Sequence, residues 1–239
     1  MVDDGESMKV EIYSDVACPW CYIGKRRFER ALADFPMADR VELVYRPFQL
    51  DPDKSTTPEP HRAYLDERYG PQSAAMDARV AELGGAESLA FDFDRVIENN
   101  TLLAHRLLWH ALNAYGAKEQ AALKDRLLVA HFAEGADVGD RGTLAALAAE
   151  AGLDRDRAAD FLASDEGRAE VLAEIDDARG IGVNAVPTFV FEGKWAVQGG
   201  QESSTFLRVL EQVAEETGVV PDAPAADTCA DGVCEAPAG

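Results

Sequence analysis

The sequence predicts an α/β fold in which a long helical segment separates two groups of strands. Alternating apolar residues predict strands at 8–13 and 41–48, on either side of a helical pattern from Tyr22 to Phe35. Helical patterns then fill residues 61–179, and two short strands and a last helix follow them. The expected order is therefore a βαβ unit, a helical domain, and a ββα unit.

The first strand–helix junction contains the most informative stretch. The strand ends before Ser14, and Pro19 occupies the first helical position, where its missing N–H costs nothing. The second strand should run parallel to the first, because the helix connects them. Pro47, near the end of this second strand, indicates an edge or a terminus of the sheet.

Residues 50–60 are rich in proline and predict a loop. Breaks at glycine then divide the helical segment, and either Asn100 or Thr101 is a suitable N-cap for one of its helices. The helices are expected near residues 60–69, 72–84, 100–115, 117–133, 142–151, 155–163 and 165–179.

After the helical segment, Val186-Pro187-Thr188 begins a strand, and Gly193 marks a tight turn into the next strand. The last helix should cover 202–217. We therefore expect a discontinuous domain from residues 1–60 and 180–217, an inserted helical domain from 61–179, and a flexible tail from 218–239. The tail is rich in proline and alanine and carries a second cysteine pair, Cys229 and Cys234.

Composition and charge limit the classes of function. The 239 residues are 47% hydrophobic, enough for a sizeable core, and 23 basic against 44 acidic residues give a net charge of −21. Such a surface repels nucleic acid and anionic membranes, so neither is an expected partner. The acidic start of the chain has no apolar stretch of the secretory kind, and the expected compartment is the cytosol.

Cys18-Pro-Trp-Cys21 at the helix start indicates redox chemistry. The free N–H groups and dipole of a helix N-terminus stabilise an anion, so the Cys18 thiolate should form readily. Cys21 lies one turn further on, where it can close a disulfide with Cys18. Cys18 would attack and Cys21 would resolve the mixed disulfide. The alternatives are a chance pair or half of a zinc site.

Two neighbours of the pair have both a functional and a structural interpretation. Asp15 could accept the proton of Cys21, because a carboxylate near a thiol can relay a proton, or it could simply be a capping or turn acid. Trp20 cannot take part in acid–base chemistry. It is expected to be an exposed apolar contact for a substrate, or else to pack on the surface of the protein itself.

The other charged and basic residues favour structural interpretations. The basic run 25–27 is expected to be a solvated helix face. His105 and His110 are five residues apart on a helix, which does not place them on one face for a metal pair. Both are therefore expected to be satisfied core or surface histidines.

Together, these motifs resemble a known family. Cys18-Pro-Trp-Cys21 with Val186-Pro187-Thr188 resembles the DsbA-type thioredoxin-fold oxidoreductases. The run 13–24, with Asn100-Thr101 and the following 102–107, is similar to their cytosolic FrnE-like subgroup. The resemblance implies a thioredoxin fold with a large α-helical insertion, and a cis Val186–Pro187 bond against the redox pair.

The same resemblance implies roles for residues around the pair. The backbone of Val186 would pair with an extended substrate, and Pro187 would keep metal and bulky groups away from the sulfurs. Thioredoxin-like folds usually carry a buried acid six residues before the nucleophile, but Ile12 stands there in this chain. The role of that acid is either lost or moved to Asp15.

The expected function is that of a cytosolic protein thiol:disulfide oxidoreductase or isomerase without a cofactor. Its partners would be protein thiols and disulfides, with glutathione or a thioredoxin-type protein as reductant. One alternative is a glutathione-dependent enzyme of the kappa-class transferase or 2-hydroxychromene-2-carboxylate isomerase type, although these usually have serine at the position of Cys18. Another is a zinc-binding module that uses all four cysteines. Cys229 and Cys234 could also form an auxiliary redox pair.

Overall fold

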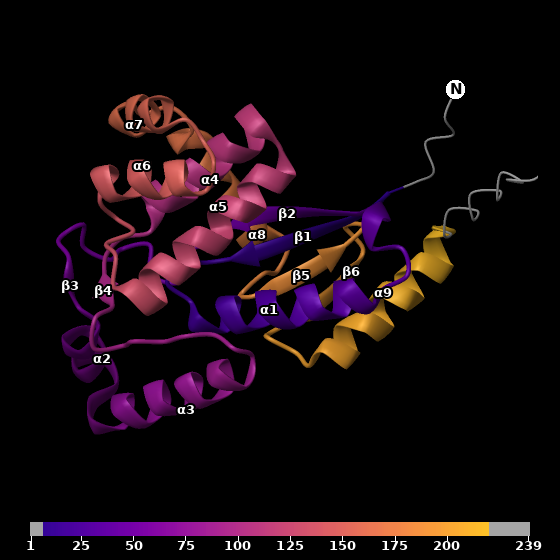
Figure 1. Ribbon diagram of the computed structural model, residues 1–239, viewed down its shortest axis with the longest axis horizontal. Helices are drawn as coiled ribbons and strands as arrows, with labels where there is room; N and C mark the ends of the chain where they lie inside the picture. The colour runs from indigo at the N-terminus through magenta and orange to yellow at the C-terminus, as the bar shows by residue number, and fades with distance from the viewer. Residues whose placement is uncertain (1–6, 220–239) are drawn as a thin grey trace, which may run out of the picture.

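The computed structural model describes residues 7–219, and a four-stranded sheet lies at its centre (Figure 1). The strand order is β2-β1-β5-β6, with β1 parallel to β2, antiparallel to β5, and β5 antiparallel to β6. The bounds of these strands are Met8–Ser14 for β1, Val41–Pro47 for β2, Thr188–Phe191 for β5 and Trp195–Gln198 for β6. The predicted parallel β1–β2 pair is thus confirmed, and Pro47 ends an edge strand as expected.

Two helices cover one face of this sheet, as Figure 1 shows. They are α1, Pro19–Asp34, and α9, Ser203–Thr217. The ring of Phe28 from α1 lies 5.1 Å from that of Phe189 on β5 and 5.3 Å from that of Phe206 on α9. Because all three rings are buried, they join α1 to the sheet through a dry aromatic contact.

All seven helices predicted between β2 and β5 are present in the described residues. Their bounds are α2 His61–Tyr69, α3 Ser73–Ala86, α4 Leu102–Tyr115, α5 Ala117–Val129, α6 Arg141–Glu150, α7 Arg155–Ala163 and α8 Arg168–Gly180. One π-helical turn, Ala130–Glu134, extends α5, and 3-10 turns occur at Ala38–Arg40 and Gly70–Gln72. The fold is therefore a thioredoxin-type α/β fold with a large helical insertion.

The inserted helices form two groups (Figure 1). Helices α4 to α7 share a buried core that includes Leu107, Leu123 and Leu144, while α2 and α3 lie beside the start of α1. Tyr22 of α1 shares a buried cluster with Val80 of α3, and its ring is stacked 6.0 Å from that of Phe132 in the π-helical turn that extends α5. The N-terminal turn of α1 is thus held between the two groups.

A short two-stranded sheet, which the sequence did not predict, lies at the end of the loop between β2 and α2. Strand β3, Glu59–Pro60, pairs antiparallel with β4, Ile97–Glu98. Two residues are too few to produce an alternating pattern, and Pro60 had pointed to a loop. The pairing brings the beginning of α2 against the segment that leads into α4.

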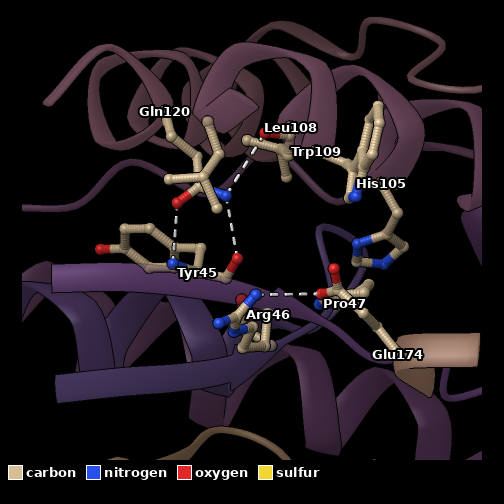
Figure 2. Close-up of a pocket in the computed structure, with 10 residues that line it drawn as sticks. Tyr45, Arg46, Pro47, His105, Leu108, Trp109, Gln120 and Glu174 are labelled. Carbon is tan, nitrogen blue, oxygen red and sulfur yellow. Dashed lines mark hydrogen bonds and ion pairs between the residues drawn. The ribbon is translucent and has the colours of Figure 1, made fainter. Parts of the chain in front are cut away.

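Helix α5 is tied to the edge of the sheet by one glutamine, as Figure 2 shows. The Gln120 side chain accepts a hydrogen bond from the Tyr45 backbone N–H at 2.8 Å and donates to its carbonyl at 2.9 Å. It also donates to the Leu108 carbonyl of α4 at 3.3 Å. Gln120 therefore takes the place of a neighbouring strand and protects the edge strand β2.

The basic residues of α1 differ from expectation, because Lys25 and Arg27 are buried rather than solvated. The Lys25 ammonium lies 2.7 Å from the Asp125 carboxylate of α5. The Arg27 guanidinium lies 2.7 Å from Glu87, the residue that follows α3, and donates to the Gly200 carbonyl at 2.8 Å. The expectation was wrong for Lys25 and Arg27, though not for the partly exposed Arg26, because the inserted helices cover this face and supply acidic partners for the two buried residues.

The proposed division into domains at residues 60, 179 and 217 stays a prediction, although the helical segment does interrupt the thioredoxin-type part. The second cysteine pair, Cys229 and Cys234, lies outside the described residues. Within 7–219, no helix combines the length and apolarity needed to cross a membrane.

Candidate active site

Cys18 and Cys21 occupy the first turn of α1, as their spacing predicts. Cys18 is the N-cap residue with an extended backbone, Pro19 is the first helical residue, and the Cys21 N–H donates to the Cys18 carbonyl at 3.0 Å. Both cysteines are free thiols, with 4% and 3% of their surface exposed. The Cys18 thiol is therefore placed at the positive end of a helix dipole.

The Val186–Pro187 segment lies directly against this pair. Its peptide bond is cis, and the Cys18 thiol donates to the Val186 carbonyl over 3.7 Å. A Cβ placed on Gly24 of α1 would come within 2.9 Å of the Pro187 ring, which shows how closely the ring approaches the redox helix. Residues about 170 positions apart in the chain thus form one site, and the isomer implied by the family resemblance is present.

Beneath the pair lies a buried carboxylate. Asp15 is 2% exposed, and its side chain accepts hydrogen bonds from the Leu50 backbone N–H at 2.9 Å and from His105 Nε2 at 3.2 Å. Burial alone would raise the pKa of Asp15, but the hydrogen bond and charge of His105, followed by the Leu50 N–H, lower it. His105 is therefore a satisfied core histidine, as expected, and its partner is a residue of the site.

A buried lysine faces the same region. Lys124 of α5 is 1% exposed, and its ammonium has no hydrogen-bond partner among the described residues. Burial lowers the pKa of Lys124, and the opposing effects come from Cys21, Asp15 and Cys18, in that order. Gln120 lies one helical turn earlier, so its clamp on β2 fixes the position of Lys124.

The pKa of Cys21 shifts in the opposite direction to that of Lys124. Burial raises the pKa of the Cys21 thiol well above its ordinary value, and the hydrogen bond with the Cys18 side chain adds to this effect. The charge of Lys124 lowers the pKa of Cys21 again. Burial thus raises the pKa of this thiol and lowers that of the nearby amine, while the charge of each ionised group stabilises the other.

A cavity of about 430 Å³ opens beside Cys18, between α1 and the α2–α3 pair. Cys18, Pro19 and Trp20 form one wall, and Trp20 is 39% exposed. The opposite walls are largely apolar and come from the β2–α2 loop, α2, α3 and the segment before β4, with Leu50, Leu65, Tyr69, Met76, Val80 and Phe93. A cavity of this size falls in the range of binding sites.

A histidine held by two carboxylates lines the same cavity. His61 Nδ1 lies 2.6 Å from Glu98, and its Nε2 lies 3.2 Å from Asp77. Burial would lower the pKa of His61, but hydrogen bonds to Glu98 and Asp77 raise it. These three residues join α2, α3 and β4, and they hold the wall of the cavity together.

The sequence analysis missed both Lys124 and the His61 cluster. A signal for Lys124 was present, because α5 buries Gln120, Leu123, Lys124 and Leu127 at helical spacing, which places two polar residues on an apolar face. No comparable signal exists for His61, whose partners are 16 and 37 residues away.

Other predicted groups do not join the site. His110 lies away from it, stacked 4.2 Å from the ring of Phe161. Within the described part of the chain, no group of three or more histidine, cysteine or acidic side chains is arranged to hold a metal ion. The four-cysteine zinc hypothesis also requires Cys229 and Cys234, which fall outside that part.

Several known proteins are similar to this chain in sequence or structure. The probable DsbA oxidoreductase SCO1869 of Streptomyces coelicolor has a similar structure, with a TM-score of 0.80, 35% identity, and coverage of 97% of this chain and 100% of that chain. Protein YwbO of Bacillus subtilis is 27% identical over 212 residues, which cover 85% of this chain and 96% of that protein. The cytosolic disulfide reductase DsbM of Pseudomonas aeruginosa, solved with GSH, has a TM-score of 0.63 at 20% identity, over 87% of this chain and 99% of that one.

The likeness to DsbM concerns the fold alone at this level of identity. SCO1869, by contrast, matches nearly the whole chain at an identity that indicates common ancestry. The model of the DSBA-like thioredoxin domain matches residues 9–220, from the first strand to beyond the last helix. The chain therefore belongs to the DSBA-like thioredoxin domain family.

Proposed function

We propose that this protein is a cytosolic thiol:disulfide oxidoreductase or isomerase that acts on protein substrates through Cys18 and Cys21. The observation that carries the proposal is the position of Cys18, at the N-cap of α1 and in the wall of a cavity, with Cys21 one turn deeper. Within residues 7–219 these are the only cysteines, and both are free. A dithiol of this kind is a catalyst rather than a structural bond in the cytosol.

The proposed reaction proceeds in two exchanges. The Cys18 thiolate attacks one sulfur of a substrate disulfide, which forms a mixed disulfide and releases a substrate thiolate. Cys21 then loses its proton and attacks the Cys18 sulfur, which releases the second substrate thiolate. The substrate gains two electrons, and the protein leaves with a Cys18–Cys21 disulfide that glutathione or a thioredoxin-type protein would reduce. The reverse sequence oxidises a substrate.

The proton of Cys21 needs an acceptor, because this thiol is buried and its pKa is raised. We propose Asp15 and Lys124 as the groups that handle it. Lys124 would accept the proton in its neutral form, which burial favours by lowering the pKa of the amine, and its charge would then stabilise the Cys21 thiolate. Asp15, anchored by His105 and the Leu50 N–H, would hold the transferred charge by its own negative charge.

Val186 and Pro187 are proposed to act on the substrate side. The Val186 backbone, whose carbonyl contacts the Cys18 thiol, would pair with an extended substrate segment. The Pro187 ring, pressed against α1, would keep metal ions and bulky groups away from the sulfurs. Trp20 would supply an exposed apolar contact for that segment.

The test uses two single replacements in the full chain with insulin as substrate. We expect Cys18→Ser to abolish reduction of insulin, because no other described thiol lies at a helix N-terminus. We expect Cys21→Ser to accumulate mixed disulfides between Cys18 and the substrate, since attack survives and resolution is lost. Near-normal insulin reduction by Cys18→Ser would refute the proposed function.

A further inference from the structure

The exposed apolar residues of this protein gather around the cavity beside Cys18. Within residues 7–219 there are six large hydrophobic side chains with substantial exposure, and four of them line this cavity. These four are Trp20 at 39%, Leu50 at 50%, Tyr69 at 41% and Met76 at 42%. Apolar surface concentrated around a concave site marks a binding surface, whereas scattered single residues carry no such meaning.

The cavity is also the approach to the nucleophile. Cys18 is only 4% exposed, yet it forms part of the cavity wall. A disulfide that approaches this sulfur through the cavity passes beside Trp20 and opposite α3. Whatever flanks the reacting cysteine of a substrate then meets the apolar side chains at the cavity mouth.

The charges in the cavity wall indicate which flanking groups fit. The basic side chains that line it, Lys54, Arg68 and His61, already have acidic partners. Arg68 lies 2.8 Å from Asp51, and Lys54 lies 3.6 Å from Glu98. An anionic ligand such as glutathione would find no uncommitted basic group among them, and the net charge of −21 adds to the repulsion. An uncharged apolar group meets neither obstacle.

We propose that this cavity binds one large apolar side chain, aromatic or long aliphatic, from the polypeptide whose cysteine reacts with Cys18. This inference rests on the proposed function and names its substrate class: cysteines flanked by an apolar residue in a neutral or basic segment. Side chains two positions apart in an extended chain point the same way. The recognised residue therefore stands two positions from the reacting cysteine.

The test measures reduction of symmetric disulfides of a five-residue peptide by the reduced full-length protein. Cysteine is central, one end residue is varied, and all other positions are alanine. We expect the peptide with phenylalanine at that end to react at least about tenfold faster than the peptide with alanine there, since even one methylene in an apolar pocket gives such ratios. Glutamate there should give no gain over alanine. Moving phenylalanine next to the cysteine should lose most of the advantage.

Two variants locate the effect. Met76→Ala should reduce the phenylalanine-to-alanine rate ratio about fivefold, because it removes apolar surface from α3, and Met76→Leu should retain the ratio. The matched control is Leu172→Ala, which removes a similarly exposed apolar side chain of α8 outside the cavity and should leave all rates unchanged.

Three results would overturn this inference while the proposed function stands. The first is equal reduction rates for all flanking residues. The second is a phenylalanine-to-alanine rate ratio in Met76→Ala equal to that of the native protein. The third is that oxidised glutathione reacts as fast as the phenylalanine peptide and loses the same share of its rate in Met76→Ala. The last result would make the cavity a glutathione site. Failure to reduce any peptide, and insulin as well, would instead refute the proposed function and this inference with it.

Discussion

Replacing Lys124 tests how the polar groups near the cysteines work. Because this lysine is buried, its removal should raise the stability of the protein and lower its activity. The ammonium is buried in the protein and has no hydrogen-bond partner in the described residues. Its pKa is lowered because burial outweighs the attraction of Cys21, Asp15 and Cys18. The charged form is therefore less favourable in the folded protein than in water.

Replacement by methionine keeps most of the side-chain volume and removes the charge. Replacing a buried charged group with an apolar one of similar size often stabilises a protein by about 1–4 kcal/mol. The opposing cost is that the Asp15 carboxylate loses a nearby positive charge. That cost is small, because Lys124 lowers the pKa of Asp15 less than His105 and the Leu50 N–H do. We therefore expect Lys124→Met to be more stable, with Tm raised by about 2–4 °C for each 1 kcal/mol.

Activity should change in the other direction. Without Lys124, the buried Cys21 thiol loses the amine that would accept its proton in the neutral form, and with it the positive charge that then stabilises the thiolate. We expect the mixed disulfide with insulin to be resolved about a hundredfold more slowly, at the lower end of what positioned proton transfer contributes. Acid quenching followed by mass spectrometry would measure the lifetime of the mixed disulfide. Lys118→Met, an exposed lysine of the same helix, is the matched control.

The pH dependence gives an independent check. A lysine whose pKa is lowered by folding penalises the native state below that pKa, and the penalty disappears as the pH rises towards the ordinary value of 10.5. The stability advantage of Lys124→Met should therefore shrink as the pH is raised. A variant that is less stable than the native protein at pH 7, with an unchanged resolution rate, would refute this account of Lys124.

Two further predictions concern the redox helix and the tail. We expect Gly24→Ala to cost about 1–3 kcal/mol of stability and to slow insulin reduction, because its Cβ would lie 2.9 Å from the Pro187 ring and 3.2 Å from the Gly200 Cα. Gly85→Ala, with open space around the new methyl, is the control, and an equal effect of both changes on melting temperature would contradict the prediction. We also propose that Cys229 and Cys234 exchange electrons with the active pair, so truncation after Thr217 should slow turnover when the reductant is limiting. Unchanged turnover, with no crosslink from Cys18 to the tail in peptide mapping, would exclude this.

The elements of this fold could be predicted from the sequence because each one carries a strong local pattern. The alternation in 8–13 and 41–48 and the helical spacing in the insertion are properties of neighbouring residues. The redox pair could be placed for the same reason, since Pro19 and the end of the first strand mark the helix start. The short β3–β4 ladder was missed because two residues carry no pattern.

The surroundings of the cysteines could be predicted only in part. Asp15 is near the pair in sequence, but His105 reaches it from α4 and Lys124 from α5. Which face of an inserted helix meets the active site depends on tertiary contacts such as the Gln120 clamp on Tyr45. Local patterns contain no information about those contacts.

The position of Lys124 also bears on how so acidic a protein can carry a reactive thiol. A net charge of −21 opposes the formation of one more anion. Salt screens exposed charges over about 8–10 Å, so most of the surface acids act weakly on the site. The α1 N-terminus acts directly on Cys18, and Lys124, buried among Cys21, Asp15 and Cys18, is screened far less. The inserted helices therefore supply local positive charge against the field of the surface, which is why the loss of this one lysine should slow the chemistry even as the fold becomes more stable.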